Sequence, residues 1–340
     1  MKAAVYYGEN DFRVEDVPKP EIGHGELLVK VRACGVCGTD LTHWYQKPKA
    51  PLVLGHEIAG DVQQVGEGVE KFRLGDRVFV HHHVACFACH YCVHGDYTLC
   101  DGFRKTHVHP GGFAEYVRVP RPNAEGDTLK MPSSMTYEAA TLIEPTACCI
   151  RGLAKTSLRP GDSLLVVGAG SIGLTYVQLG KRVAGISRVI VSEIVPKRAQ
   201  TALSFGADVA VGPSTQTLSE AVARATEGRG ADAAVVTVGS AQAIESAVES
   251  VRRGGTVVVF APPSPDERIT LNPSKLFFSE VKLASSYSCS HLETRQARDL
   301  IAAGVVEAER LITHRFKLGQ ISEAMKAASS REALKVVVLP

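Results

Sequence analysis

Four closely spaced cysteines constrain the fold of this chain more than any other feature. They are Cys86, Cys89, Cys92 and Cys100, separated by two, two and seven residues. Four thiolates at such spacings can close around one Zn²⁺ at about 2.3 Å per bond, and Gly95 permits the tight turn that closure needs. A zinc ion with four protein ligands has no position left for a substrate. The stretch therefore predicts a structural zinc site that holds a lobe of the protein together.

Disulfides and unliganded core thiols are the competing explanations for these cysteines. The first ten residues lack the long apolar segment of a signal peptide, so we expect a cytoplasmic protein whose nine cysteines stay reduced. Zinc ligands and small core residues are then the more common roles for cysteine. Several histidines surround the stretch, but four thiolates already complete a tetrahedron. We therefore expect the following to be strand and loop residues: His81, His82, His83, His90 and His94.

Length and charge exclude several classes of protein. A chain of 340 residues is long for one core, so two domains are expected. Lys and Arg total 38 against 36 Asp and Glu, and a net charge of +2 gives no electrostatic basis for binding nucleic acid or an anionic membrane. No apolar run approaches the roughly 20 residues that a membrane span needs. We expect neither nucleic acid nor membrane as a partner.

A second possible metal set lies upstream of the four cysteines. Cys37, His56 and a neighbouring carboxylate such as Glu57 would offer the sulfur, nitrogen and oxygen ligands that zinc accepts. Cys34 and Cys37 also form a Cys-x2-Cys pair, which could indicate a redox dithiol. No thioredoxin-like βαβ pattern surrounds that pair, so the redox interpretation is disfavoured.

Three short stretches carry a resemblance to a known family. The run Gly55-His56-Glu57-x2-Gly60-x5-Gly66-x2-Val69 resembles the zinc signature of the medium-chain alcohol dehydrogenase family. Cys37-Gly38-Thr39-Asp40 is similar to that family's first catalytic-zinc ligand and its neighbours, and the four-cysteine stretch matches its structural-zinc lobe. The matches follow the order of the family over nearly the whole chain.

The resemblance implies two zinc ions per chain, one catalytic and one structural. It assigns the catalytic zinc to Cys37, His56 and Glu144, with Glu57 as an exchanging ligand or a holder of water. A lone glutamate at position 144 would otherwise be read as a cap or a surface residue. That position is a cysteine in the familiar alcohol dehydrogenases and a glutamate in the branch that includes polyol (sorbitol-like) dehydrogenases. Cys148 and Cys149 follow one turn later and are expected to be core thiols.

The proton pathway is the point at which this sequence departs from its relatives. Thr39 matches the family's hydroxyl that takes the alcohol proton. Many relatives carry a histidine five residues after the zinc cysteine, whereas this chain has Thr42 there and His43 one place later. A shift of one residue on a helix turns a side chain by about 100°. His43 is therefore a candidate for the relay only if the loop differs by one residue.

A dinucleotide-binding fingerprint occupies the middle of the chain. Gly168-Ala-Gly170-Ser171-Ile172-Gly173 follows an apolar strand and opens a helix, and a second strand from Arg188 ends about twenty residues later at Glu193. The glycines permit the turn, the approach of the pyrophosphate and the packing of helix on strand, and the pyrophosphate sits at the helix N-terminus. Glu193 would accept from both ribose hydroxyls and repel a 2′-phosphate, which favours NAD over NADP. Lys197 and Arg198 complicate that choice, although in the polyol branch a basic residue at the Arg198 position accompanies NAD.

Strands and helices alternate through the rest of this region, which predicts a doubly wound parallel sheet in an α/β fold. Strand-like runs lie near Val209 and at 233–238, 255–260 and 281–285, with helix-like stretches at 219–226 and 241–251 between them. Residues at the strand ends should face the nicotinamide. They include Thr237, Val238, Phe260 and Ser286.

The two ends of the chain are expected to form one mainly β, GroES-like catalytic domain. The sequence predicts strands at 27–31 and 111–117, helices at 294–303 and 320–328, and a closing strand at 333–339. The resemblance implies that this tail returns to the first domain. The expected boundaries are 1–148 and 289–340 for the zinc-bearing domain and 149–288 for the NAD-binding Rossmann domain.

These features predict a zinc-dependent oxidoreductase that moves hydride between a secondary alcohol and NAD and forms the ketone. Residues around 43–45, 103–109 and 286–289 would line the substrate pocket, and their polar and aromatic character favours a polyol, sugar alcohol or cyclitol. A threonine-dehydrogenase-like enzyme, a simple secondary alcohol dehydrogenase and a zinc- and nucleotide-binding protein without turnover remain alternatives. The resemblance alone suggests a homodimer or homotetramer.

Overall fold

A computed structural model describes residues 1–212 and 217–340. The described chain divides into two compact units. Unit 1 comprises Met1–Ala147 and Cys289–Pro340, and unit 2 comprises Cys148–Ser288. Helix α6 (Ile143–Ala154) contains the first point at which the chain passes from one unit to the other. Within the described residues, no helix is both long and apolar enough to cross a membrane.

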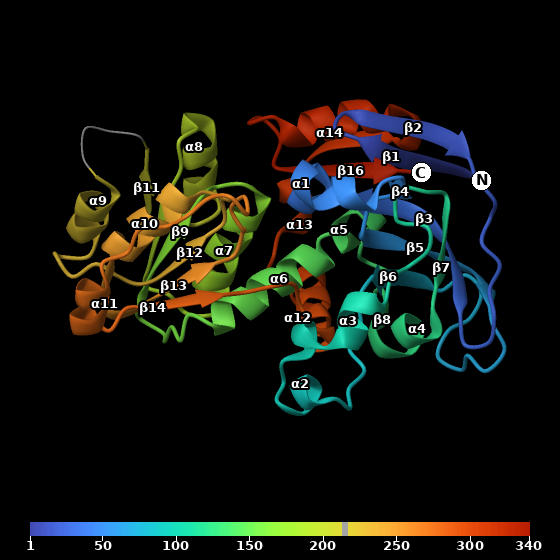
Figure 1. Cartoon of the computed structure of the whole chain (residues 1–340), viewed down its shortest axis with the longest axis horizontal. Coiled ribbons are helices and arrows are strands. Elements are labelled where there is room, and N and C mark those ends of the chain that lie inside the picture. Colours follow the sequence, from blue (N-terminus) through green and yellow to red (C-terminus); the bar gives the residue numbers. More distant parts are fainter. Residues whose placement is uncertain (213–216) are drawn as a thin grey trace. The chain divides into compact units, whose positions relative to one another are not determined.

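Unit 2 is built on a six-stranded parallel sheet, which confirms the predicted doubly wound fold (Figure 1). Its strands run in the order β11-β10-β9-β12-β13-β14, so the sheet grows outward in both directions from β9, as in dinucleotide-binding folds. The strands are β9 (Ser163–Val167), β10 (Arg188–Ser192), β11 (Val209–Val211), β12 (Ala231–Val236), β13 (Val251–Val259) and β14 (Lys282–Ser285). The helices are α7 (Ser171–Arg182), α8 (Pro196–Ser204), α9 (Leu218–Ala225), α10 (Ala241–Ser250) and α11 (Pro273–Ser279).

Side chains alternate across the central strands of this sheet, and each face packs against different helices. On one face, Leu165, Ile190 and Val257 form a core with the helices α9 and α10. On the other face, Leu164 and Val189 lie close to Gly180 of α7. A strand that is buried on both faces reads as a continuous apolar run, which is the pattern seen at 163–167 and 231–236.

Unit 1 contains a mixed seven-stranded sheet and a three-stranded sheet, and its core joins both ends of the chain. The larger sheet runs β15-β16-β3-β5-β6-β8, with β7 paired to β3, and the smaller one runs β2-β1-β4. The strands are β1 (Lys2–Gly8), β2 (Asp11–Asp16), β3 (Leu27–Gly35), β4 (Leu52–Val53), β5 (Glu57–Val65), β6 (Arg77–His81), β7 (Tyr116–Val119), β8 (Thr128–Lys130), β15 (Ile312–Lys317) and β16 (Lys335–Leu339).

The helices of unit 1 are mostly short and carry or support the candidate site. They are α1 (His43–Gln46), α2 (His90–Val93), α3 (Asp101–Lys105), α4 (Arg121–Asp127), α5 (Tyr137–Ala140), α12 (His291–Ala302), α13 (Ala308–Leu311) and α14 (Ile321–Ser329). Four 3-10 turns complete them: η1 (Gly38–Leu41), η2 (Lys47–Lys49), η3 (Tyr97–Leu99) and η4 (Leu318–Gln320). The last strand, β16, pairs with β3 through Val337 opposite Gly35 and Val338 opposite Cys34. This pairing places the C-terminal strand directly beside the strand that leads to Cys37.

The strand predicted at 111–117 is the clearest local error. The regular strand β7 begins only at Tyr116, and residues before it form bends and an isolated bridge between Ala114 and Ala3. A Cβ atom on Gly111 would lie 2.2 Å from the carbonyl oxygen of Val53, and one on Gly112 would lie 2.5 Å from the Cys34 sulfur. These glycines therefore serve close packing of the backbone against β4 and β3 rather than strand formation.

Candidate active site and metal centres

The four cysteines of the lobe converge as predicted. The ligand atoms of Cys86, Cys89, Cys92 and Cys100 all lie within 4.8 Å of one another. The sulfur of Cys92 lies 3.6 Å from that of Cys89 and 4.0 Å from that of Cys86. Two sulfurs bound to one tetrahedral zinc at 2.3 Å are about 3.8 Å apart, so the donor set fits a closed zinc site.

The lobe lowers the pKa of one thiol and raises that of another. The backbone amides of Ala88 and Cys89 lower the pKa of Cys86 to about 6. Burial, followed by hydrogen bonds with the neighbouring thiols, raises the pKa of Cys92 to about 12. Because thiolates repel one another, full deprotonation of the set requires a cation, which zinc would supply.

A second donor set forms where η1 meets the start of β5. The ligand atoms of Cys37, His56 and Glu57 lie within 4.8 Å of one another. Asp40 is buried; one of its oxygens accepts from the Cys37 backbone amide at 3.0 Å, and the other lies 3.6 Å from His56 Nδ1. A carboxylate at Nδ1 leaves Nε2 as the nitrogen for an ion, an arrangement typical of metal-binding histidines. Asp40 belongs to the motif around Cys37, but the sequence predicted no role for it.

Glu57 is fully buried and forms an ion pair with Lys335, the first residue of β16. Burial raises the pKa of Glu57, the charges of Lys335 and His56 act to lower it, and Glu144 raises it again. The Lys335 ammonium also donates to the carbonyl oxygen of Val36 at 3.0 Å. Lys335 was not foreseen as a site residue, because only the pairing of the last strand with β3 brings it near position 57.

Glu144 lies in the first turn of α6 and faces a different pair of donors. Its ligand atom lies within 4.8 Å of those of His81 and Cys289, and all three residues are buried. The Glu144 charge nevertheless acts on the pKa of Glu57 and of Lys335, so the two donor sets belong to one electrostatic environment. The assignment of Glu144 to the catalytic zinc therefore stays a prediction. Cys149 is fully buried and Cys148 is 8% exposed, as expected for core thiols.

The two candidates for proton transfer differ in their surroundings. Thr39 is exposed and lies two residues after Cys37 in η1. His43 begins α1, and its Nδ1 lies 2.9 Å from the hydroxyl of Tyr6 on β1. Burial, with a smaller effect of the Glu9 charge, raises the pKa of Tyr6. The participation of His43 in a relay stays a prediction.

Phe103, the first residue of the segment 103–109 that was expected to line the substrate pocket, is buried inside the cysteine lobe. Phe103 is 1% exposed and packs with Ala85, Cys92 and Cys100 inside the cysteine lobe. Its ring is the largest fully buried side chain of that small apolar cluster. Trp44 and Tyr45 are exposed, at 44% and 41%.

The glycine-rich turn of unit 2 has the conformation that a dinucleotide requires. Gly168 adopts a φ of +100°, and its backbone amide donates to the Ser192 carbonyl oxygen at 2.8 Å. A Cβ on Gly173 would lie 1.9 Å from the carbonyl oxygen of Gly168, so helix and strand pack tightly there. Space beside Gly170 is open, since a Cβ there would meet no atom within 4 Å. Such an open turn at the N-terminus of α7, beside Ser171 and Ile172, fits a pyrophosphate.

Glu193 follows β10 and holds this turn in place. One carboxylate oxygen accepts from the Ala169 amide and the other from the Val195 amide, each at 2.8 Å. The remaining lone pairs of a carboxylate can accept from ribose hydroxyls. Arg198 lies in α8, two residues after the start of that helix.

The predicted strand-end residues of unit 2 follow their strands as expected. Thr237 and Val238 come directly after β12, Phe260 after β13 and Ser286 after β14. The Thr237 hydroxyl donates to the Val167 carbonyl oxygen at 2.8 Å. Because the carboxyl ends of parallel strands share one edge, these residues lie at the same edge of the sheet as the glycine turn.

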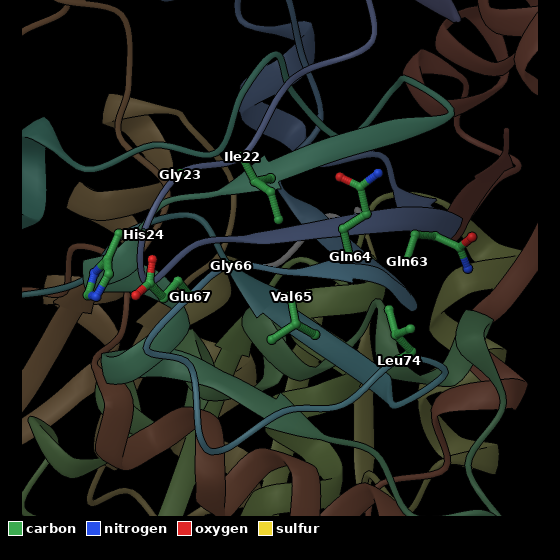
Figure 2. Close-up of a pocket in the computed structure, with 9 residues that line it drawn as sticks. All are labelled: Ile22, Gly23, His24, Gln63, Gln64, Val65, Gly66, Glu67 and Leu74. Carbon is green, nitrogen blue, oxygen red and sulfur yellow. The ribbon is translucent and has the colours of Figure 1, made fainter.

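A surface depression of about 700 Å³ lies elsewhere in unit 1 (Figure 2). Gln63 and Gln64 of β5 lie toward one end of it, and His24 and Glu67 lie toward the other. None of its lining residues belongs to either donor set or to the cysteine lobe. The depression is therefore separate from the candidate active site.

Comparison with known proteins decides the family. Residues 23–133 match the family model described as alcohol dehydrogenase GroES-like domain, and residues 171–303 match the model described as zinc-binding dehydrogenase. A sorbitol dehydrogenase of Bacillus subtilis (strain 168) is 34% identical, over 100% of this chain and 97% of that protein. The chain belongs to the zinc-binding alcohol dehydrogenase family.

Other members of the zinc-binding alcohol dehydrogenase family differ in what their names say they act on and bind. An L-threonine 3-dehydrogenase of Symbiobacterium thermophilum is 33% identical over 96% of this chain and 94% of its own. A zinc-binding dehydrogenase from Sinorhizobium meliloti 1021, solved bound to NADP, is 31% identical with a TM-score of 0.90 and covers 100% of this chain and 99% of its own. This protein is accordingly a zinc-dependent alcohol or polyol dehydrogenase with a nicotinamide cofactor.

Proposed function

We propose that this enzyme oxidises a polyol, sugar alcohol or cyclitol at a secondary hydroxyl to the ketone, with NAD as the hydride acceptor. The observation that carries the proposal is the donor set of Cys37 and His56, with Asp40 at His56 Nδ1, combined with glutamate rather than cysteine at position 144. The sorbitol dehydrogenase relative supports the polyol class. The zinc-bearing domain is then 1–148 with 289–340, and the NAD-binding domain is 149–288.

Cys37, His56 and Glu144 would hold the catalytic zinc, with Glu57 as an exchanging ligand, and the four cysteines would hold the structural zinc. Bound zinc supplies a Lewis acid for a substrate hydroxyl, and the nicotinamide supplies the hydride acceptor. Asp40 fixes the orientation of His56, and Lys335 keeps Glu57 charged in a buried place. The Thr39 hydroxyl takes the substrate proton, and His43 is the candidate that passes it outward.

Glu193 is the residue that favours NAD in this proposal. Glu193 is 7% exposed, and its carboxylate accepts from two backbone amides, so it cannot turn away from a 2′-phosphate without breaking these hydrogen bonds. Like charges at such a site disfavour NADP. We expect kcat/KM to be higher with NAD⁺ than with NADP⁺, even though one structural relative binds NADP.

NAD⁺ reduction by the purified enzyme across sorbitol, other alditols, inositols, threonine and simple secondary alcohols tests the function. We expect the highest kcat/KM among the polyols. His56→Gln removes a proposed zinc ligand. Changes to outer-sphere partners of a metal lower activity by at most about a hundredfold, so we expect this variant to lower kcat/KM by more than that. The matched control, His314→Gln on β15, should follow the wild type. Turnover confined to a primary aliphatic alcohol would refute the polyol assignment.

Threonine oxidation is the second candidate, since a threonine dehydrogenase relative matches almost as well as the sorbitol dehydrogenase. A threonine kcat/KM above that of every polyol in the same panel would establish it. Without added zinc, the purified enzyme should hold about two zinc ions per chain in either case.

A further inference from the structure

Three buried side chains outside the Cys37–His56–Glu57 set converge at the junction of β6, α6 and the segment before α12. His81 and Cys289 are fully buried, and Glu144 is 6% exposed. Their ligand atoms lie within 4.8 Å of one another. Imidazole, carboxylate and thiolate are the three donor types that zinc accepts. Neither His81 nor Cys289 has a role in the proposed reaction.

The spacing of these atoms fits a metal ion. His81 Nε2 lies 3.7 Å from the sulfur of Cys289. A nitrogen and a sulfur on one tetrahedral zinc, at about 2.0 and 2.3 Å, are about 3.5 Å apart. In the cysteine lobe, the sulfur–sulfur distances from Cys92 are 3.6 and 4.0 Å, which also fit ligands of one zinc ion.

The surroundings of His81 repeat those of His56. His81 Nδ1 lies 2.7 Å from an oxygen of the buried Asp127. The other Asp127 oxygen accepts from the Thr294 hydroxyl at 2.6 Å and lies 3.5 Å from Arg295, so this carboxylate is itself fixed. A carboxylate on Nδ1 directs Nε2 toward an ion and raises the basicity of the ring. Asp40 faces His56 Nδ1 beside Cys37 in a similar way, but at the longer distance of 3.6 Å.

A metal-free explanation exists for part of this arrangement. The Cys289 thiol lies 3.8 Å from the Glu144 carbonyl oxygen and can donate a weak hydrogen bond to it. That contact accounts for a buried cysteine, which is common in protein cores. The same thiol can also donate to His81 Nε2, 3.7 Å away, while Nδ1 donates to the fixed Asp127 carboxylate, so the geometry fits both a metal-free network and an ion, and metal counting decides between them.

We propose that His81, Glu144 and Cys289 form a further zinc-binding position in unit 1, which shares Glu144 with the catalytic zinc. Because Glu144 is one of the three ligands proposed for the catalytic ion, an ion at the new position draws that carboxylate away from catalysis or bridges the two ions. Excess zinc therefore inhibits the enzyme through this position. Binding of the ion rests only on the contacts above, whereas the inhibition also rests on the proposed function.

Metal counting on the whole chain tests the binding. Wild type, Cys289→Ala and Cys149→Ala are equilibrated with excess Zn²⁺, desalted and analysed for zinc per chain. Cys149 is a matched control because it is also fully buried but belongs to none of the donor groups. We expect about three ions in the wild type and the control, and about two in Cys289→Ala. Two ions in all three proteins would overturn the proposal.

A cobalt titration of the wild type keeps the proposal testable even if a variant fails to fold. Addition of Co²⁺ to metal-depleted protein should give thiolate-to-cobalt absorption in three successive stages, whose last stage is missing in His81→Gln. A titration that ends after two stages would also overturn the proposal. Excess zinc should lower the turnover of the wild type several-fold and leave that of Cys289→Ala unaffected. A protein with about three ions and no NAD⁺ reduction would instead refute the proposed function alone.

Discussion

At the scale of single residues, the buried pair of Glu57 and Lys335 is the contact on which the site most depends. Both side chains are almost inaccessible, at 1% and 4% exposure. Removing one partner of a buried pair leaves the other charge uncompensated, which typically costs about 3–5 kcal/mol. We therefore expect Lys335→Met to lower the free energy of unfolding of unit 1 by about that amount in chemical denaturation, with Lys326→Met on the exposed face of α14 as the control.

The pH dependence of this loss has a definite sign. Burial lowers the pKa of Lys335, but the charges of Glu57 and Cys37 outweigh it and leave that pKa raised above 10.5. A group whose pKa is raised on folding stabilises the folded state fully at pH values below its pKa in the unfolded chain. This stabilisation is lost as the pH rises through its pKa in the folded protein. The difference between wild type and Lys335→Met should thus be constant at neutral pH and shrink above pH 10.5. A gap that does not change at high pH would show that the ion pair does not stabilise the fold.

Several residues of the candidate site could not be identified from the sequence, for a physical reason. Cys37 and His56 fall in motifs, and the structure brings them together beside Glu57. Lys335 and Cys289 reach their positions only through the folding of distant segments, and Asp40 lies close to Cys37 in the chain but has no signal of its own in the sequence. His81 was expected to be a strand residue, and it does end β6, but its position in a strand says nothing about which side chains its ring meets.

At the scale of elements, the alternation of strands and helices in unit 2 was predictable because each strand is an apolar run and each helix has one apolar face. Helices at 219–226 and 241–251 were expected, and α9 and α10 begin and end within one residue of those bounds. The strand predicted at 233–238 ends instead at Val236, since Thr237 turns its hydroxyl to the Val167 carbonyl oxygen. Hydrophobic pattern thus located the elements, whereas their ends depend on individual hydrogen bonds.

The cysteine lobe is an element whose stability depends on its metal. Its helix α2 has four residues and η3 has three, too few to fold without a cross-link. We expect Cys92→Ser to lower the melting temperature and to disturb assembly while the zinc chemistry at Cys37 and His56 persists. Differential scanning calorimetry and zinc counting, with Cys149→Ser as the control, would measure both. A Cys92→Ser protein of normal stability and assembly but without turnover would contradict this division of roles.

At the scale of the whole molecule, unit 2 presents an apolar surface that a second copy of the chain could cover. Phe277 and Phe278 of α11 are 75% and 79% exposed, and Leu283 of the edge strand β14 is 42% exposed. An exposed strand edge with apolar neighbours is a ready template for pairing, and a two-fold axis would let two β14 strands meet symmetrically. We expect the homodimer or homotetramer that the family resemblance suggests to use this edge. Replacing both phenylalanines by serine should reduce the mass in light scattering to about half, because a two-fold contact joins the molecule in pairs.

The control for this experiment is Leu74→Ser in unit 1, which removes a side chain that is 69% exposed and lies away from α11 and β14 in the sequence. It should leave the mass unchanged, since Leu74 belongs to neither α11 nor β14. Unchanged melting temperature in the double variant would show that the fold of unit 2 is intact. A wild type that is already monomeric, or a double variant that keeps the full mass, would exclude the β14 edge as the interface between subunits.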